Sequence, residues 1–215
     1  MFDTPLLLSR NNGLSFEQKL VKRFMDIVIS LVMLIITSPF MLVTAVAIKL
    51  YDGGHVFFRQ KRCTIDGKEF FIHKFRSMIV DAEKEGEVIP ATEDDDRITP
   101  VGKVIRKTRL DELPQFIDIL KGDMSVVGPR PERVEHVEQY TQEIPEFAYR
   151  LKVKGGLTGY AQIYGKYNTT AYDKLKLDLM YIQNYSFLLD LKLIIMTVKI
   201  IFVKESTEGF EDTEK

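Results

Sequence analysis

The chain has 215 residues, which is enough for one sizeable domain and tight for two. Its 30 lysines and arginines are balanced by 31 aspartates and glutamates, so the basic surplus that nucleic-acid binding calls for is absent. The single cysteine, Cys63, excludes an internal disulfide framework, and with three scattered histidines it gives no zinc-site spacing. Any metal ion used should therefore be a hard one held by carboxylates and phosphates, such as Mg²⁺.

The N-terminal part divides into a polar segment and an apolar one. Residues 1–21 are polar, with a turn signal at Asn11-Asn12-Gly13, and we expect them to form a loop-like lead-in. Within residues 22–50, the run from Ile27 to Ile48 carries no charge over 22 residues. That length suffices to cross a bilayer as one helix.

Three interpretations of this apolar run compete. Basic residues before it and Ala45-Val46-Ala47 within it resemble a signal peptide, but the apolar region is too long for one. A straight transmembrane helix is the usual meaning of such a run. However, Ser38-Pro39 lies in its middle, where proline removes a backbone donor, and basic residues flank both ends without the asymmetry of a spanning helix.

A hairpin accounts for both observations. Each half would be about 18–22 Å long at 1.5 Å per residue, which is too short to cross a bilayer alone. We therefore expect residues 22–50 to form a re-entrant helix–break–helix, broken at Ser38-Pro39, with both ends on one membrane face. Residues 51–204 then form the soluble domain, and residues 205–215 an acidic tail.

The soluble domain begins with signals for a β-hairpin. Val56 to Phe58 reads as a short strand, Asp66-Gly67 as a hairpin turn, and Glu69 to Phe75 as a second strand. The basic cluster at residues 59–62 is typical of an anchor on anionic lipid headgroups. Further acidic stretches follow: residues 81–89 read as a solvated loop, and the aspartates at 94–96 as a structural turn into a helix over 101–107.

Adjacent carboxylates, Asp111 and Glu112, stand at the start of the next expected helix. Pro114 suits its first turn, and Gly122 is a natural stop. The positive end of the helix dipole should favour the ionised form of both acids.

Arginines flank this acidic pair in the sequence. Arg106 lies just upstream, and Arg130 lies downstream between two prolines that restrict its backbone. Acids with arginines converging on them suit phosphoryl chemistry. A charged helix cap beside a solvated basic loop explains the same spacing, and the residues alone leave both interpretations open.

The C-terminal half offers fewer chemical signals. Residues 132–142 form a polar amphipathic helix, and residues 155–162 a glycine-rich turn followed by a short extended run that is not a P-loop. Helical spacing continues from Ala171 to Tyr185. Residues 187–204 are apolar but interrupted by charges, which indicates an in-plane amphipathic helix, or alternatively a helix buried in the core.

DELPQ followed by KGDMSVVGPRP, together with KFRSM and GGLTGYAQ, resembles the bacterial sugar transferase family, the monotopic phosphoglycosyl transferases. The resemblance covers nearly all of residues 20–204. It implies an α+β, predominantly helical domain on the membrane, with a Ser-Pro break in a re-entrant helix, a small β-hairpin and in-plane amphipathic helices. It also implies a place on the cytoplasmic face of a bacterial inner membrane.

The implied reaction moves a sugar-1-phosphate from a UDP-sugar to polyprenyl (undecaprenyl) phosphate and releases UMP, as a first membrane step of exopolysaccharide or capsule synthesis. Asp111 would carry the covalent sugar-phosphate, with Glu112 assisting. Mg²⁺ would be held by Asp111 and Asp178. The residues expected to bind phosphate or nucleotide are Lys74, Arg76, Arg106, Arg130, Gln162 and Lys166.

This chain departs from the family pattern at Gly155, Tyr160 and Lys166, where proline, tryptophan and arginine are usual. Lys166 keeps the charge and loses the bidentate fork. A catalytically silent scaffold of glycan assembly and a UDP-sugar hydrolase are the alternative functions. The sequence leaves open which sugar and pathway are served, whether the protein forms a homodimer, and whether Met1 is the natural start, since larger relatives carry further N-terminal membrane helices.

Overall fold

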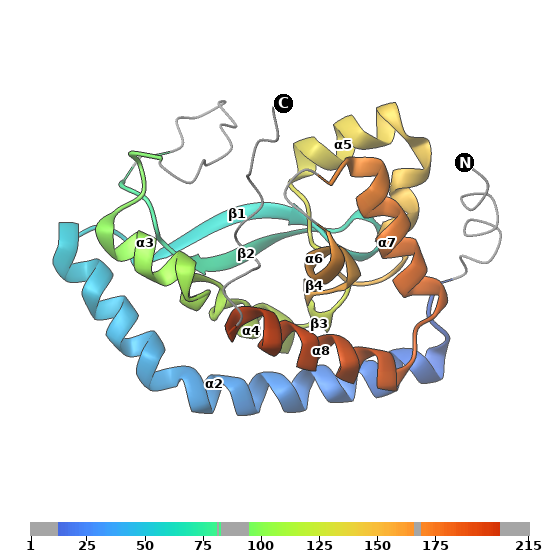
Figure 1. The fold of residues 1–215 in the computed structure, drawn as a ribbon, viewed down its shortest axis with the longest axis horizontal. Coiled ribbons are helices and arrows are strands. Elements are labelled where there is room, and N and C mark those ends of the chain that lie inside the picture. The colour runs from blue at the N-terminus through green and yellow to red at the C-terminus, as the bar shows by residue number, and fades with distance from the viewer. Residues whose placement is uncertain (1–12, 81, 83–94, 166–168, 203–215) are drawn as a thin grey trace, which may run out of the picture.

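The computed structural model describes residues 13–80, 82, 95–165 and 169–202. The fold is mostly helical, and Figure 1 shows one long helix, α2, running along one side of the other elements. The helices are α2 (Phe16–Asp52), α3 (Pro100–Lys107), α4 (Gln115–Lys121), α5 (Val134–Glu143), α6 (Tyr160–Tyr164), α7 (Ala171–Gln183) and α8 (Phe187–Phe202). The strands are β1 (Phe57–Cys63), β2 (Glu69–Phe75), β3 (Ser125–Val127) and β4 (Gly156–Thr158).

Helix α2 begins earlier than predicted. The Ser15 hydroxyl accepts a hydrogen bond from the Gln18 N–H, and the Gln18 side chain accepts one from the Ser15 N–H. This capping box starts the helix at Phe16, so the prediction of a loop-like lead-in is wrong for residues 16–21, whereas residues 1–12 lie outside the described part. The helix ends at Gly53, which has a left-handed conformation.

The predicted break at Ser38-Pro39 is also wrong, because α2 stays helical through both residues. Pro39 has no N–H to donate to the carbonyl of Ile35, one turn earlier. The Ser38 hydroxyl donates to that carbonyl instead, at 2.8 Å. The helix therefore keeps its backbone satisfied and bends: Figure 1 shows α2 changing direction about halfway along its length.

The predicted hairpin is confirmed. Strands β1 and β2 pair antiparallel, and the turn between them places Asp66 and Gly67 in the left-handed region, with φ of 56° and 73°. Strand β2 has the predicted bounds. Strand β1 is longer than predicted and includes the basic cluster at residues 59–62, whose contact with lipid stays a prediction.

The main core lies between the hairpin, the short parallel pair β3–β4, and helices α2, α4, α7 and α8. Helix α7 confirms the predicted helix and buries Leu175, Leu179 and Ile182. The predicted helix at 101–107 is confirmed as α3, which Thr99 caps after the turn at Asp95 and Arg97. The glycine-rich segment departs from prediction, because only residues 156–158 are extended and α6 follows directly.

Helix α8 lies along α2 (Figure 1); its burial confirms the interpretation as a core helix on one face, whereas its in-plane position on a membrane stays a prediction. Its inner face is core: Asp190 is fully buried and bonds Lys22 of α2 at 2.7 Å. Its outer face exposes Leu188 and Ile195, which are 74% and 68% exposed. Helix α8 therefore has one face buried in the protein and apolar side chains exposed on the opposite face.

Candidate active site

The acidic pair lies in a short 3₁₀ turn, Leu110–Glu112, one turn before α4. Pro114 caps α4 and Gly122 ends it in a left-handed conformation, so the predicted stop is confirmed. Arg109, just before the pair, has φ of 58°, a left-handed conformation that is uncommon for a residue with a side chain. The carboxylates are thus presented ahead of α4, not within its first turn.

Glu112 is fixed by two cations. Its Oε1 accepts hydrogen bonds from Lys74 Nζ at 2.9 Å and from Arg130 Nη2 at 2.7 Å. The side chain is 13% exposed. Although burial acts in the opposite direction, these two cations hold the pKa of Glu112 well below its usual range. Glu112 is therefore an anion that organises the cations of the site.

Asp111 has the opposite electrostatic environment. Its Oδ1 is buried and has no hydrogen-bond partner among the residues that the structure describes. Burial, together with the neighbouring Glu112 carboxylate, raises the pKa of Asp111 despite Lys74, Arg109 and Arg106 nearby. The expectation that the helix dipole favours ionisation of both acids is wrong for Asp111, because desolvation outweighs it.

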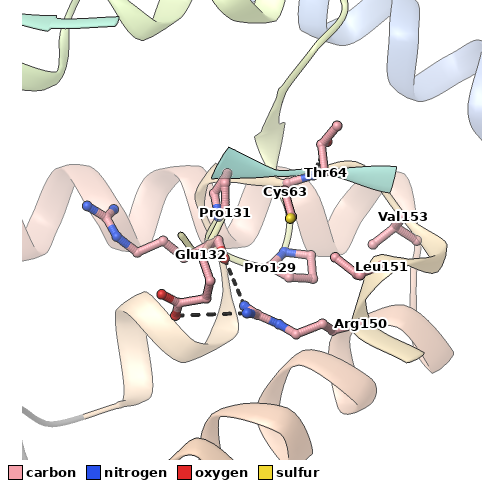
Figure 2. Close-up of a pocket in the computed structure, with 10 residues that line it drawn as sticks. Cys63, Thr64, Pro129, Pro131, Glu132, Arg150, Leu151 and Val153 are labelled. Atoms are coloured by element: carbon pink, nitrogen blue, oxygen red, sulfur yellow. Dashed lines mark hydrogen bonds and ion pairs between the residues drawn. The ribbon is translucent and has the colours of Figure 1, made fainter. Parts of the chain in front are cut away.

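The loop that carries Arg130 is fastened at four consecutive carbonyls. Figure 2 shows the guanidinium of Arg150 reaching this loop from below, with contacts to the loop backbone and to Glu132. Such anchoring fixes the direction in which Arg130 leaves the loop. The acceptor carbonyls and their donors are Pro129 with Gly156 N (2.8 Å), Arg130 with Arg150 Nη2 (2.8 Å), Pro131 with Arg62 Nη1 (3.2 Å) and Glu132 with Cys63 N (3.0 Å).

The close packing behind this loop requires glycine. A Cβ on Gly156 would lie 2.1 Å from the Gly128 nitrogen, and one on Gly159 would lie 2.2 Å from the Gly128 carbonyl oxygen. The glycine-rich segment thus serves backbone contact between β3 and β4 and the Arg130 loop, rather than a phosphate cradle.

Asp178 binds the guanidinium of Arg150, which in turn holds this loop, and it does not have the environment of a metal ligand. It is 1% exposed, and its Oδ2 accepts from Arg150 Nε at 2.9 Å and Nη2 at 2.8 Å. Burial raises the pKa of Asp178 to about 6. Because an arginine occupies this carboxylate, the prediction that Asp178 and Asp111 share Mg²⁺ is not supported. Sequence reasoning missed Arg150, which only the fold brings to Asp178.

Arg76, which was also predicted to bind phosphate, lies away from the acidic pair. Arg76 is bound to Asp52 at the end of α2, at 2.6 Å, and to the His55 carbonyl, so the structure does not bring it to the acidic pair. Strand β2 ends at Phe75, and with it ends the alternation expected to align Arg76 with Lys74.

Gln162 lies beside the Arg130 loop, where its Nε2 approaches the Gly156 carbonyl at 3.5 Å and its Oε1 is buried without a partner in the described residues. Arg106 is near enough to Asp111 for its charge to oppose the rise in the pKa of Asp111, but it forms no ion pair with a described residue. Lys166 lies outside the described part of the chain.

The side chains available as metal ligands can be compared with the predicted Mg²⁺ site. No group of three or more metal-ligating side chains occurs within the described residues. Mg²⁺ commonly binds through one or two carboxylates and the substrate's own phosphates. The free, buried Oδ1 of Asp111 fits such a site, whereas Glu112 already has two cations.

Helix α2 is long and apolar enough to enter a membrane, and a carboxylate oxygen without a described partner, beside an acid held by two cations, suits a protein that handles phosphoryl groups. Comparison with known proteins gives the family. The bacterial sugar transferase family matches residues 17–204, and the chain belongs to that family.

Two curated relatives are named for related activities, and a third is uncharacterized. UDP-glucose:undecaprenyl-phosphate glucose-1-phosphate transferase of Klebsiella pneumoniae is 46% identical over 211 residues, which are 96% of this chain and 43% of the relative. UDP-N-acetylgalactosamine-undecaprenyl-phosphate N-acetylgalactosaminephosphotransferase of Aeromonas hydrophila is 45% identical, covering 84% of this chain and 43% of the relative. An uncharacterized sugar transferase of Bacillus subtilis is 39% identical, covering 88% and 91%. The chain thus spans less than half the length of the first two and nearly all of the third.

Proposed function

We propose that this chain transfers a sugar-1-phosphate from a UDP-sugar to polyprenyl phosphate and releases UMP. The support comes from the family, from two relatives whose names state this type of reaction, and from the charge arrangement of the site. The observation that carries the proposal is the contrast between the two adjacent acids. Glu112 is bound by two cations, whereas Oδ1 of Asp111 has no partner among the described residues, which leaves Asp111 available as the nucleophile.

The reaction proceeds in two displacements. A carboxylate oxygen of Asp111 forms a bond to the sugar-bearing β-phosphorus, and the bond from that phosphorus to the bridging oxygen breaks, so UMP leaves with the electron pair. An oxygen of the lipid phosphate then attacks the same phosphorus. The acyl-phosphate bond breaks, which restores the Asp111 carboxylate and gives polyprenyl-diphospho-sugar.

The charged residues have separate roles in these steps. Arg130, held in direction by its loop, binds phosphate oxygens through its remaining donors. Lys74 binds the same oxygen of Glu112 as Arg130 does and adds a second positive charge to the site. When bound, Mg²⁺ would offset the charge of the diphosphate, with Asp111 as its protein ligand.

The position of α2 supports a monotopic arrangement on one membrane face. Its first half bonds the soluble domain, because Asp26 accepts from the Ser125 hydroxyl and the Val126 N–H. Its second half packs Ile48 against Phe75 and Ile105 of the same domain. A helix crossing straight through a bilayer would draw these polar elements into the lipid. A bent helix lets the site face a soluble donor and a lipid acceptor from the cytoplasmic side.

The test is UMP release from a panel of UDP-sugars with Mg²⁺, in the presence and absence of polyprenyl phosphate. We expect turnover with one sugar that depends on the lipid and is lost in Asp111→Asn. UMP release at full rate without lipid would favour a UDP-sugar hydrolase. No release from any donor, by folded and membrane-bound protein, would leave a silent scaffold.

A further inference from the structure

A polar row on α4 and the turn before it faces strand β2. Glu112 bonds Lys74 of β2, and six residues later Asp118 accepts from the His73 N–H at 2.9 Å and from its ring at 2.6 Å. All residues from 110 to 121 have helical geometry. In a helix, side chains three and four positions apart share a face. The residue between these two contacts on the same face is Gln115.

Gln115 is buried, and the nitrogen of its side-chain amide is unpaired within the described part of the chain. The side chain is 1% exposed, and its Nε2 has no hydrogen-bond partner among the described residues. Leaving a buried amide donor unpaired is costly, and native proteins rarely do so without a reason. The next apolar positions of α4, Phe116 and Ile119, point into the core, so an apolar residue at position 115 would also pack. Packing alone does not explain this glutamine.

The second unpaired atom of the same row explains it. Asp111 precedes Gln115 by four residues, and its Oδ1 is also buried without a partner. One atom is a donor and the other an acceptor, yet they do not bond each other. A tetrahedral phosphoryl group complements both atoms at once. Its phosphorus can be attacked by the Asp111 oxygen, and one of its non-bridging oxygens can accept a hydrogen bond from Gln115 Nε2.

We propose that Gln115 is a catalytic residue that donates a hydrogen bond from Nε2 to a non-bridging oxygen of the phosphoryl group on which Asp111 acts. This assignment rests on the proposed transferase function. A neutral donor adds to the charges of Lys74 and Arg130 without being drawn to the Glu112 carboxylate, and it is in place before the substrate arrives. Preorganised donors of this kind stabilise charge that develops in a transition state.

The experiment compares wild type with Gln115→Leu, which keeps the volume and removes the donor. Two quantities are measured in detergent or nanodiscs: the single-turnover rate of UMP release at saturating UDP-sugar, and the midpoint of thermal unfolding. We expect the rate to fall roughly 10²-fold, as for loss of one oxyanion donor. The apparent KM for UDP-sugar should change much less. The unfolding midpoint should stay equal or rise, because an unpaired buried donor has been removed.

Gln139→Leu is the matched control, since Gln139 is exposed on α5 and bonds only Glu143 among the described residues. It should leave both quantities unchanged. A wild-type rate in Gln115→Leu would overturn the role of Gln115, and so would a rate that falls only together with the unfolding midpoint, which a structural residue would give. A wild type that releases no UMP from any donor would overturn the transferase proposal itself, and the role of Gln115 with it.

Discussion

The negative charge of Glu112 reduces the repulsion between two cations of the site, Lys74 and Arg130. In Glu112→Gln, Lys74 and Arg130 lose the negative charge of the carboxylate that both bind, at 2.9 and 2.7 Å. We expect the free energy of unfolding to fall by roughly 2–4 kcal/mol, somewhat less than for a fully buried pair because Arg130 keeps contact with solvent. Chemical denaturation measures this. The control Glu143→Gln, exposed on α5, should stay within about 0.5 kcal/mol of wild type, and an equal value for both variants would contradict the prediction.

We expect the Asp111 carboxylate to lower the stability of the folded protein while being required for activity. Its folded-state pKa is raised by burial and by Glu112, so the folded protein binds its proton more tightly than the unfolded chain does. Stability therefore falls as pH rises from about 4 through the folded pKa. We expect Asp111→Asn to be inactive, and more stable than wild type at pH 7 by roughly 1–2 kcal/mol.

Unfolding midpoints of both proteins across pH 4–8 test this expectation, and the difference between them should shrink toward pH 4. Asp66→Asn serves as control, because this exposed turn residue has a left-handed backbone that asparagine also tolerates. A difference that does not change with pH would show that the titration of Asp111 is not its source.

At the scale of elements, α7 holds the Arg130 loop through one buried ion pair. Asp178→Asn leaves Arg150 without its main partner, so we expect a loss of roughly 2–4 kcal/mol in stability. The concentration of Mg²⁺ that gives half-maximal activity should stay unchanged, because Asp178 is bound to an arginine. A metal ligand would instead shift it tenfold or more. Asp173→Asn, exposed on the same helix, is the control and should change neither quantity.

Elements with a local pattern were predictable from sequence. Alternation and a turn dipeptide gave β2 and the hairpin, and helical spacing gave α7. The contacts that hold the Arg130 loop were not predictable. Arg150 binds Asp178, which is 28 positions away in the sequence, and the Arg130 carbonyl, which is 20 positions away. No periodicity encodes such contacts.

The face of α2 that contacts the rest of the domain has a pattern in the sequence that was not recognised, because the basic residues before the apolar run were considered only as flanking charges. Lys22, Asp26 and Ser30 recur every four residues, which places them on one face of a helix, and all three are buried. Polar residues at helical spacing beside an apolar run indicate a face turned to protein rather than to lipid. The break at Ser38-Pro39 was overpredicted, since proline's missing donor was considered without the neighbouring hydroxyl that replaces it.

At the scale of the whole molecule, α2 exposes apolar side chains along its outer side while polar contacts line its inner side. Ile35, Leu42 and Leu50 are 73%, 67% and 81% exposed. Its 37 residues would extend about 55 Å if straight, well beyond the hydrocarbon thickness of about 30 Å. Since both of its halves are bound to one domain, the proposed monotopic arrangement requires the helix to enter the lipid from the side of that domain and return to it.

In the proposed monotopic arrangement, we expect the two ends of α2 to lie on the same side of the membrane. In a Cys63→Ser background, cysteine is placed at Glu17, near the start of the helix, or at Tyr51, near its end; both positions are exposed. A membrane-impermeant maleimide should label both variants in inverted vesicles and neither in intact spheroplasts, because both ends then face the cytoplasm. Labelling of the two positions from opposite sides would establish a spanning helix. In that case the contacts of Lys22 with Asp190 and of Ile48 with Phe75 could not coexist in the membrane-bound protein.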